Sequence, residues 1–229
     1  MVVRSATFAG KITIGLLGCV LAMPSHAITV NELVPGQIWV SEFMPDPAAV
    51  ADSAGEWIEL VNPLPVSIDL AGLVIRSGAE SYALTAGTGT ILASGAYFLL
   101  GRSATGNGGI APNQVWSGIV LSNSSDSIQL ENGLGQTLFS VSWTSSAAGK
   151  SYSLQTISPP YTLTAANYYV ETSVSYNGTD FGTPGSANSV AAIGTAPPVP
   201  EPETWTMLLA GLGFVGIATR CRGRAIGSA

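Results

Sequence analysis

The sequence is poor in the residues that carry most nucleophilic and metal chemistry. Its 229 residues include one histidine and two cysteines. His26 and Cys19 lie near the N-terminus and Cys221 near the C-terminus, so the stretch from Ile28 to Pro198 contains neither residue type. This excludes from that stretch Ser-His-Asp and Cys-His catalysis, zinc sites with nitrogen or sulfur ligands, and disulfides. We expect it to fold on its hydrophobic core alone.

Positive charge is also scarce in the same stretch. It holds twelve acidic residues against three basic ones, Arg76, Arg102 and Lys150, which gives a net charge of −9. An acidic surface without a basic stripe repels phosphate backbones, so the composition argues against nucleic-acid binding. The length is sufficient for one domain with a sizeable core.

The N-terminus has the pattern of a secretory signal peptide. Arg4 and Lys11 precede an apolar run over residues 12–23, which Pro24 ends. Ser25 and Ala27 are small residues at the positions that a signal peptidase requires, so we predict a signal peptide over residues 1–27 with cleavage after Ala27. An alternative is lipidation of Cys19, because residues 16–19 read Leu-Leu-Gly-Cys, as in a lipobox.

The C-terminus contains a second apolar run. Residues 205–219 carry no charge and would span about 22 Å as a helix, short of the bilayer core of about 30 Å. Trp205 on one side and three arginines on the other are suited to anchoring a short span. We predict a single transmembrane helix within residues 204–229. The arginines are Arg220, Arg222 and Arg224.

A G-x-G-x-x-G pattern lies inside this run, at residues 211–216. A dinucleotide fingerprint requires a preceding strand and an acidic residue about twenty positions later, and both are absent here. We interpret the glycines as small residues that allow close helix approach in a membrane.

The end of the chain resembles a PEP-CTERM sorting tail of exported Gram-negative bacterial proteins. Val199-Pro200-Glu201-Pro202, the short apolar run and the arginine cluster follow one another in the order of that family. The resemblance implies that an exosortase, a membrane protease, recognises Pro200, Glu201 and Pro202. It also implies transient anchoring in the inner membrane, with the arginines as the positive stop, before transfer to the cell surface or the medium. Residues 189–203, rich in Ala and Pro, would be a semi-rigid linker.

The middle of the chain alternates short apolar runs with Ser, Thr and Gly, as in an all-β sandwich or barrel. Asn132-Gly133 marks a hairpin, and a bulge near Phe139 would restore its alternation of buried side chains. Apart from the two ends, no useful helical period is present. Strands are predicted at 37–43, 56–61, 73–75, 96–100, 126–131, 137–143, 151–154 and 168–170.

This region resembles the lamin tail domain. The matching segments are residues 40–47, 55–63, 68–72 and the closing turn at 182–188, which begins Gly182-Thr-Pro-Gly. The resemblance implies an immunoglobulin-like β-sandwich, here over residues 28–188. Leu73-Val-Ile-Arg76 departs from the pattern, because no aromatic residue follows Gly72.

Four acidic residues near one loop, Asp46, Asp52, Glu56 and Glu59, have two interpretations. Hard oxygen ligands on a strand-joining loop would suit calcium, whereas solvated surface acids need no ligand. The spacing does not match an EF-hand. No other cofactor is expected, and a hydrolase that uses only Asp and Glu would need two such carboxylates across a cleft.

The tryptophans of this region also allow two interpretations. They would form a platform for sugars if exposed, or fill the core of a sandwich if buried. Trp57 and Trp143 lie among alternating apolar positions, which predicts burial. The four residues are Trp39, Trp57, Trp116 and Trp143.

Together these features predict an exported, non-enzymatic protein of the envelope or extracellular matrix with a structural or adhesive role. The alternatives are a carbohydrate- or calcium-binding module, with extracellular polysaccharide as a partner in the first case, and the Asp/Glu hydrolase.

Overall fold

The computed structural model describes residues 26–87, 89–194 and 196–197. The predicted signal peptide up to residue 25, the sorting residues and the predicted transmembrane helix lie outside these ranges. Within them, no helix has the length and hydrophobicity needed to cross a bilayer. The predicted cleavage site after Ala27 directly precedes the first strand, and the Ile28 amide there donates to the Ser67 carbonyl at 3.0 Å.

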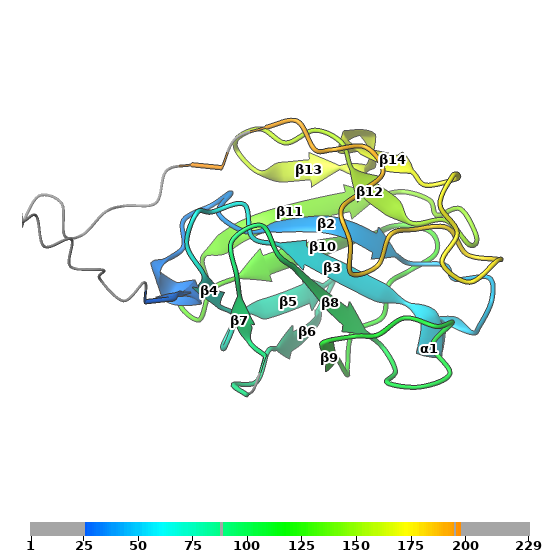
Figure 1. Cartoon of the computed structure of the whole chain (residues 1–229), viewed down its shortest axis with the longest axis horizontal. Coiled ribbons are helices and arrows are strands. Elements are labelled where there is room, and N and C mark those ends of the chain that lie inside the picture. Colours follow the sequence, from blue (N-terminus) through cyan, green and yellow to red (C-terminus); the bar gives the residue numbers. More distant parts are fainter. Residues whose placement is uncertain (1–25, 88, 195, 198–229) are drawn as a thin grey trace, which may run out of the picture.

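Two large β-sheets stack on each other as a sandwich (Figure 1), which confirms the predicted all-β class. Both sheets are mixed, because each includes one parallel pair at or near an edge. In spatial order, the six-stranded sheet contains β14 (Tyr168–Val170), β12 (Tyr152–Leu154), β2 (Trp39–Met44), β3 (Trp57–Val61), β8 (Tyr97–Gly101) and β9 (Gln114–Val115). The five-stranded sheet contains β13 (Thr162–Thr164), β11 (Thr137–Trp143), β10 (Asp126–Glu131), β5 (Val74–Ser77) and β6 (Glu80–Ala83).

Smaller elements close the ends of the sandwich. A three-stranded sheet contains β1 (Ile28–Thr29), β4 (Ile68–Asp69) and β7 (Ile91–Leu92). A single helical turn, α1 (Asp52–Gly55), precedes β3, although no helix was predicted there. Two 3₁₀ turns are η1 (Val30–Glu32) and η2 (Ala165–Asn167).

The core between the two sheets is centred on Phe43 of β2. Its ring lies 4.9 Å from the ring of Trp143 in the opposite sheet, and 5.1 Å and 5.4 Å from those of Tyr152 and Tyr168. Aromatic pairs at these distances add to the stabilisation from area burial. The predicted burial of Trp143 is confirmed.

Two bulges decide which side chains face this core. In β11, Leu130 pairs with Phe139 and Glu131 with Thr137, so Leu138 is the extra residue and the predicted bulge is confirmed. In β2, Val40 pairs with Leu60 and Glu42 with Glu59, which leaves Ser41 unpaired. A bulge reverses the alternation of side chains, so Phe43 joins the core while Glu42 lies on the opposite side of the sheet.

We call that side the outer face of the six-stranded sheet. A second apolar cluster lies on it, formed by Met44, Trp57, Leu99 and Ile110. The chain after β14 returns across this face, and we call residues 182–194 the strap. Figure 1 shows this final described segment running over the sheet and leaving the domain on the side where the first described residues lie.

Candidate functional site

Two carboxylates lie side by side under the strap. Glu42 of β2 and Glu59 of β3 are cross-strand neighbours, and both are fully buried. The Glu42 carboxylate accepts hydrogen bonds from the hydroxyls of Ser151 and Ser153 and from the Thr183 amide and hydroxyl. Buried charged groups persist where such donors satisfy them, so this carboxylate fixes the start of the strap.

Glu59 has fewer donors than its neighbour. The Ser41 hydroxyl donates to Oε1 at 2.6 Å, and the Gly185 amide donates to Oε2. Burial raises the pKa of Glu59 to about 8, and the nearby Glu42 carboxylate adds to the rise. Burial also raises the pKa of Glu42, against the effect of its hydroxyl donors. Because adjacent buried carboxylates disfavour two charges, we assign the proton of the pair at neutral pH to Glu59.

Two glycines allow the strap to lie this close to the sheet. A Cβ atom on Gly182 would come within 3.0 Å of Ser151 Oγ and of the Trp57 ring, and within 3.1 Å of Glu42 Oε1. Gly185 has a φ of 83°, which side-chain-bearing residues rarely adopt, and this turn aims its amide at Glu59. The glycines of the closing turn are therefore required by packing and backbone geometry.

The strap remains attached beyond this turn. The Asn188 amide donates to the carbonyls of Ser41 and Leu154, at 3.0 Å and 3.2 Å. Ile193 exchanges backbone hydrogen bonds with Gln155 and Ile157, each at 2.8 Å. Residues 189–194 of the predicted linker thus lie against the domain, while residues 198–203 are outside the described ranges.

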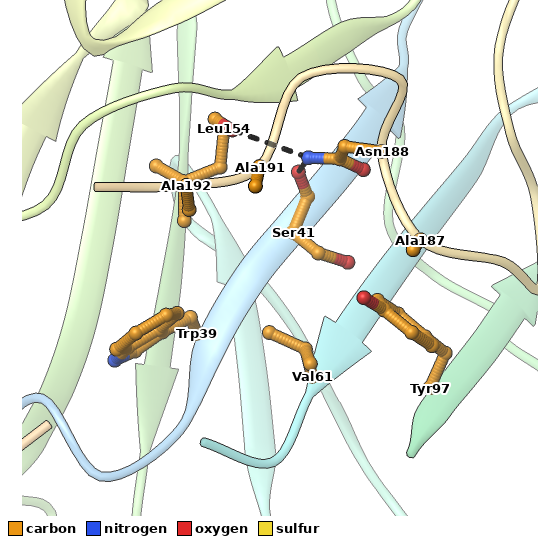
Figure 2. A pocket seen from close by; sticks show the side chains of 9 residues that line it. All are labelled: Trp39, Ser41, Val61, Tyr97, Leu154, Ala187, Asn188, Ala191 and Ala192. Carbon is orange, nitrogen blue, oxygen red and sulfur yellow. Dashed lines mark hydrogen bonds between the residues drawn. The ribbon is translucent and has the colours of Figure 1, made fainter. Parts of the chain in front are cut away.

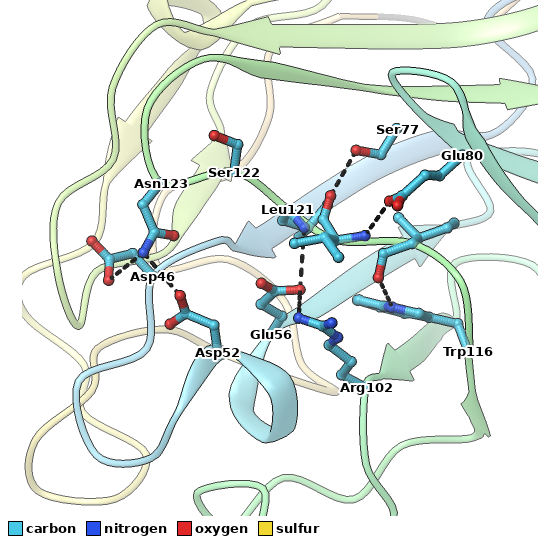
Figure 3. Close-up of polar contacts among 12 residues, drawn as sticks. Asp46, Asp52, Glu56, Ser77, Glu80, Arg102, Trp116, Leu121, Ser122 and Asn123 are labelled. Atoms are coloured by element: carbon cyan, nitrogen blue, oxygen red, sulfur yellow. Dashed lines mark hydrogen bonds and ion pairs between the residues drawn. The ribbon is translucent and has the colours of Figure 1, made fainter.

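The four predicted calcium ligands do not gather at one point. Asp46 and Asp52 meet at the Asn123 amide, which donates to them at 3.3 Å and 2.9 Å (Figure 3). Glu59 lies under the strap. In the ranges that the structure describes, no three His, Cys, Asp or Glu side chains form a group that could hold a metal ion. Calcium binding at the remaining pair, Asp46 and Asp52, stays a prediction.

Glu56 is the fourth of these residues and has a separate role. Its Oε2 atom accepts from the Arg102 guanidinium at 3.1 Å and from the Leu121 amide at 3.2 Å (Figure 3). Its Oε1 atom is buried and has no partner among the described residues. Burial raises the pKa of Glu56 to about 7, opposed by the Leu121 amide and the Arg102 charge. Glu56 therefore fastens the start of β3 to the loop before β10.

All four tryptophans of the domain are buried. Trp57 and Trp143 are 0% and 2% exposed, which confirms both as core residues, and Trp116 is 2% exposed. Trp39 is 8% exposed. The alternative interpretation, an exposed platform made by these four residues, is therefore wrong, although the edge of Trp39 lines the pocket described next.

A pocket of about 210 Å³ remains open on the outer face beside the strap (Figure 2). One wall is a cross-strand row in which Trp39 pairs with Val61 and Val61 with Tyr97. Figure 2 shows the Trp39 and Tyr97 rings on opposite sides, with Val61 between them. The rest of the lining is Ser41, Leu154, Ala187, Asn188, Ala191 and Ala192.

Sequence reasoning missed Glu42, Asn188 and the pocket residue Tyr97. Glu42 follows Val40 at a spacing of two, so an unbroken strand would place both on the core face. Only the bulge at Ser41 moves Glu42 outward, and a bulge leaves little signal in a short strand. Asn188 was part of the recognised closing turn, but its partners on β2 and β12 are distant in sequence.

Residues 32–145 match the Lamin Tail Domain family, and residues 198–223 match the PEP-CTERM protein-sorting motif. The chain therefore contains a lamin tail domain and a PEP-CTERM sorting motif, as both resemblances predicted. No curated protein matches the chain.

The two matches together indicate an exported protein that an exosortase sorts toward the cell surface. The folded unit extends beyond the lamin tail match, because β12, β13 and β14 follow residue 145 and pair with the two sheets. The strap then brings the chain to the start of the sorting motif.

Proposed function

We propose that this protein is a non-enzymatic component of the envelope or of an extracellular matrix, in which its immunoglobulin-like sandwich has a structural or adhesive role. After export directed by the signal peptide, the C-terminal helix holds the chain in the inner membrane. Exosortase then recognises Pro200, Glu201 and Pro202 and releases or transfers the domain outward. The observation that carries this proposal is the sorting motif at residues 198–223, placed directly after the folded domain.

The arrangement of the carboxylates supports a non-enzymatic role. Of the acidic residues, the adjacent pair Glu42 and Glu59 most resembles the two catalytic carboxylates of a glycoside hydrolase. Both are 0% exposed and are bonded to the strap, so a substrate has no route to them in this conformation. The Glu56 carboxylate forms an ion pair with Arg102. These acids have structural partners in place of a substrate.

The three cations of the domain are likewise used internally. Arg76 binds Glu131 at 2.6 Å and Arg102 binds Glu56. Lys150 lies 3.1 Å from the centre of the Phe181 ring. The remaining surface charge is therefore strongly acidic, which favours solubility outside the cell over binding to anionic polymers.

The test replaces Pro200, Glu201 and Pro202 together by Ala in a host that carries an exosortase. The prolines keep the backbone extended outside the bilayer, where an active site can bind it. We expect the parent to lose its C-terminal helix and the triple variant to stay full length in the inner membrane. Mass measurement of the membrane and surface fractions reads the outcome.

A second variant tests the positive stop. Replacing Arg220, Arg222 and Arg224 by Ala should let the chain move outward without being cut, because no charge then holds the helix at the cytoplasmic side. Sorting would be refuted if the parent and the variant with Ala at Pro200, Glu201 and Pro202 both kept an intact C-terminus. The C-terminal helix would then be a plain membrane anchor.

A further inference from the structure

The pocket beside the strap has the construction of a small binding site. Its walls are the row Trp39–Val61–Tyr97 together with Leu154 and the alanines of the strap. At about 210 Å³ it is smaller than the about 300–1,000 Å³ of pockets for drug-sized ligands, so it has room for one ring of a larger molecule.

The polar groups around the pocket are few and available. The Tyr97 hydroxyl, on a half-buried side chain, makes no hydrogen bond to any residue that the structure describes, nor do the backbone amides of Ala191 and Ala192. The Ser41 hydroxyl already donates to Glu59 but retains acceptor capacity. Apolar walls with a few unsatisfied donors and acceptors are characteristic of sites for small ligands.

The charge around the pocket limits the ligand further. No residue of its lining is ionised at neutral pH, and the buried Glu42 and Glu59 pair lies on the same face, two residues along the strands. The surrounding domain is acidic, with twelve acids and three bases between Ile28 and Pro198. An anionic ligand would be repelled.

We propose that this pocket binds one ring of a neutral polysaccharide. A pyranose ring has apolar C–H faces that suit the Trp39 and Tyr97 rings, and hydroxyls that suit the hydroxyls of Tyr97 and Ser41. This inference rests on the proposed adhesive role at the cell surface and names the partner of that role. In this proposal the strap also forms part of the binding site. The Asn188 side chain holds the strap residues at the pocket wall by donating to the carbonyls of Ser41 and Leu154.

The experiment uses the full chain, purified in mild detergent, so that its result does not depend on sorting. Affinity electrophoresis compares gels that contain dextran, xylan or hydroxyethylcellulose with gels that contain alginate, an anionic polysaccharide. We expect retardation by at least one neutral polysaccharide and none by alginate.

Two variants locate the binding. Ala191→Trp fills the pocket from an exposed strap position, and Tyr97→Ala removes one aromatic wall. Each should lower the association constant derived from the retardation about tenfold or more, as expected for a central binding residue. Ala148→Trp, on an exposed loop outside the pocket, and Tyr82→Ala, on β6, are the matched controls and should bind as the parent. Thermal unfolding establishes that each variant is folded.

Three results would overturn the proposal: no retardation of the parent by any of the three neutral polysaccharides, equal retardation by alginate, or full binding by folded Ala191→Trp. If sorting fails in cells while these gels show pocket-dependent binding, the proposed route to the surface is wrong and the binding site stands.

Discussion

At the level of single residues, polar side chains in β3 and directly before and after it hold the loops of the sandwich in place. Asn62, directly after the strand, donates to the carbonyls of Val66 and Leu92 and accepts from the Leu64 amide at 2.9 Å. Glu56 and Glu59 fasten two other segments in the same way. The Glu-Trp-Ile-Glu-Leu-Val-Asn motif thus combines core side chains with three internal polar anchors.

Trp57 and Trp143 should be among the most costly positions to truncate. Each fills a fully enclosed site, and Trp57 also donates to the Tyr176 hydroxyl at 3.3 Å. We expect Trp57→Ala or Trp143→Ala to lower the free energy of unfolding by about 3 to 5 kcal/mol. Urea unfolding measures it, with Leu134→Ala as control because Leu134 is 77% exposed. A loss below about 1 kcal/mol would contradict burial of either ring.

Glu59 should make the domain less stable as the pH rises. Its folded pKa of about 8 exceeds the unfolded value of about 4.3, so the folded state holds a proton that the unfolded chain releases. The free energy of unfolding should therefore fall between about pH 4.5 and about pH 8, and Glu56 acts with the same sign. Hydrogen bonds from Ser173 and Ser189, against the effect of burial, lower the pKa of Glu171 to about 2, so Glu171 acts only at lower pH.

Glu59→Gln should flatten this pH dependence, because Gln keeps an acceptor for the Gly185 amide and never ionises. Urea midpoints across the window measure the slope. Glu80→Gln, at an exposed position, is the control and should leave the slope as in the parent. A slope that Glu59→Gln leaves unchanged would show that Glu59 is already ionised in the folded state.

At the level of elements, the strap is the least regular part of the domain, yet it covers the two carboxylates. Its contacts are hydrogen bonds to β2, β3 and β12 and not a strand ladder, apart from one isolated bridge between Thr156 and Ile193. Segments held by few contacts open at lower free energy than the sheets around them. Local release of the strap should therefore be separable from global unfolding.

Gly182→Val should release the strap. The added side chain meets Ser151, Trp57 and Glu42 at distances that force the backbone away. We expect faster proteolytic cleavage within residues 183–194 while the sandwich stays folded. Gly87→Val is the matched control, since no atom lies within 4 Å of the Cβ position at Gly87. Equal cleavage in both variants would show that the strap does not depend on this close approach.

Local pattern predicted the long strands well, and the reason is physical. β10 and β11 begin and end at the predicted residues, because alternating burial and a strong turn signal define them. The bounds of the three-residue β14 also match the prediction. The strands β1, β4, β6, β7, β9 and β13 were missed. Most have two or three residues, too few for a period, and they form because distant segments place a partner beside them.

The candidate site was predictable only in part. The closing turn and the acidic residues were recognised, but not that Glu42 and Glu59 meet under the strap. That meeting depends on the bulge at Ser41 and on contacts across more than a hundred residues, such as Thr183 with Glu42. Sequence spacing carries no information on either.

At the level of the whole molecule, the domain should be independent of metal and of disulfides. Neither Cys nor His occurs between Ile28 and Pro198. Thermal unfolding with and without chelator and reductant should give the same midpoint. A fall of more than about 4 °C on chelation, the effect of about 1 kcal/mol, would instead favour the calcium interpretation.

The docked strap also limits how far the sorting motif stands from the domain. Ile193 is hydrogen-bonded to the sheet side at both its amide and its carbonyl. The six peptide steps from Gly194 to Pro200 reach at most about 20 Å even when fully extended. If the C-terminal run anchors the chain as proposed, a docked strap would keep the folded domain within this distance of the point where exosortase cuts.

Shortening this connection should impair processing. Deletion of residues 195–199 joins Gly194 to Pro200 and brings the motif against the sandwich, where the domain blocks the protease. We expect less cutting in an exosortase host, with full-length chain accumulating in the inner membrane, as measured by the mass of the membrane and surface fractions. Replacement of the same five residues by a Gly/Ser segment of equal length should be cut as the parent is.

The cause of that defect can be tested with the strap itself. If distance is limiting, adding Gly182→Val to the deletion frees strap residues to act as a longer connection, because undocking through Gly194 adds up to about 40 Å of extended chain. Cutting should then recover. A deletion variant that is processed like the parent would show that the strap is not docked during sorting. A defect that Gly182→Val leaves unrelieved would place the requirement in the sequence of residues 195–199 and not in their length.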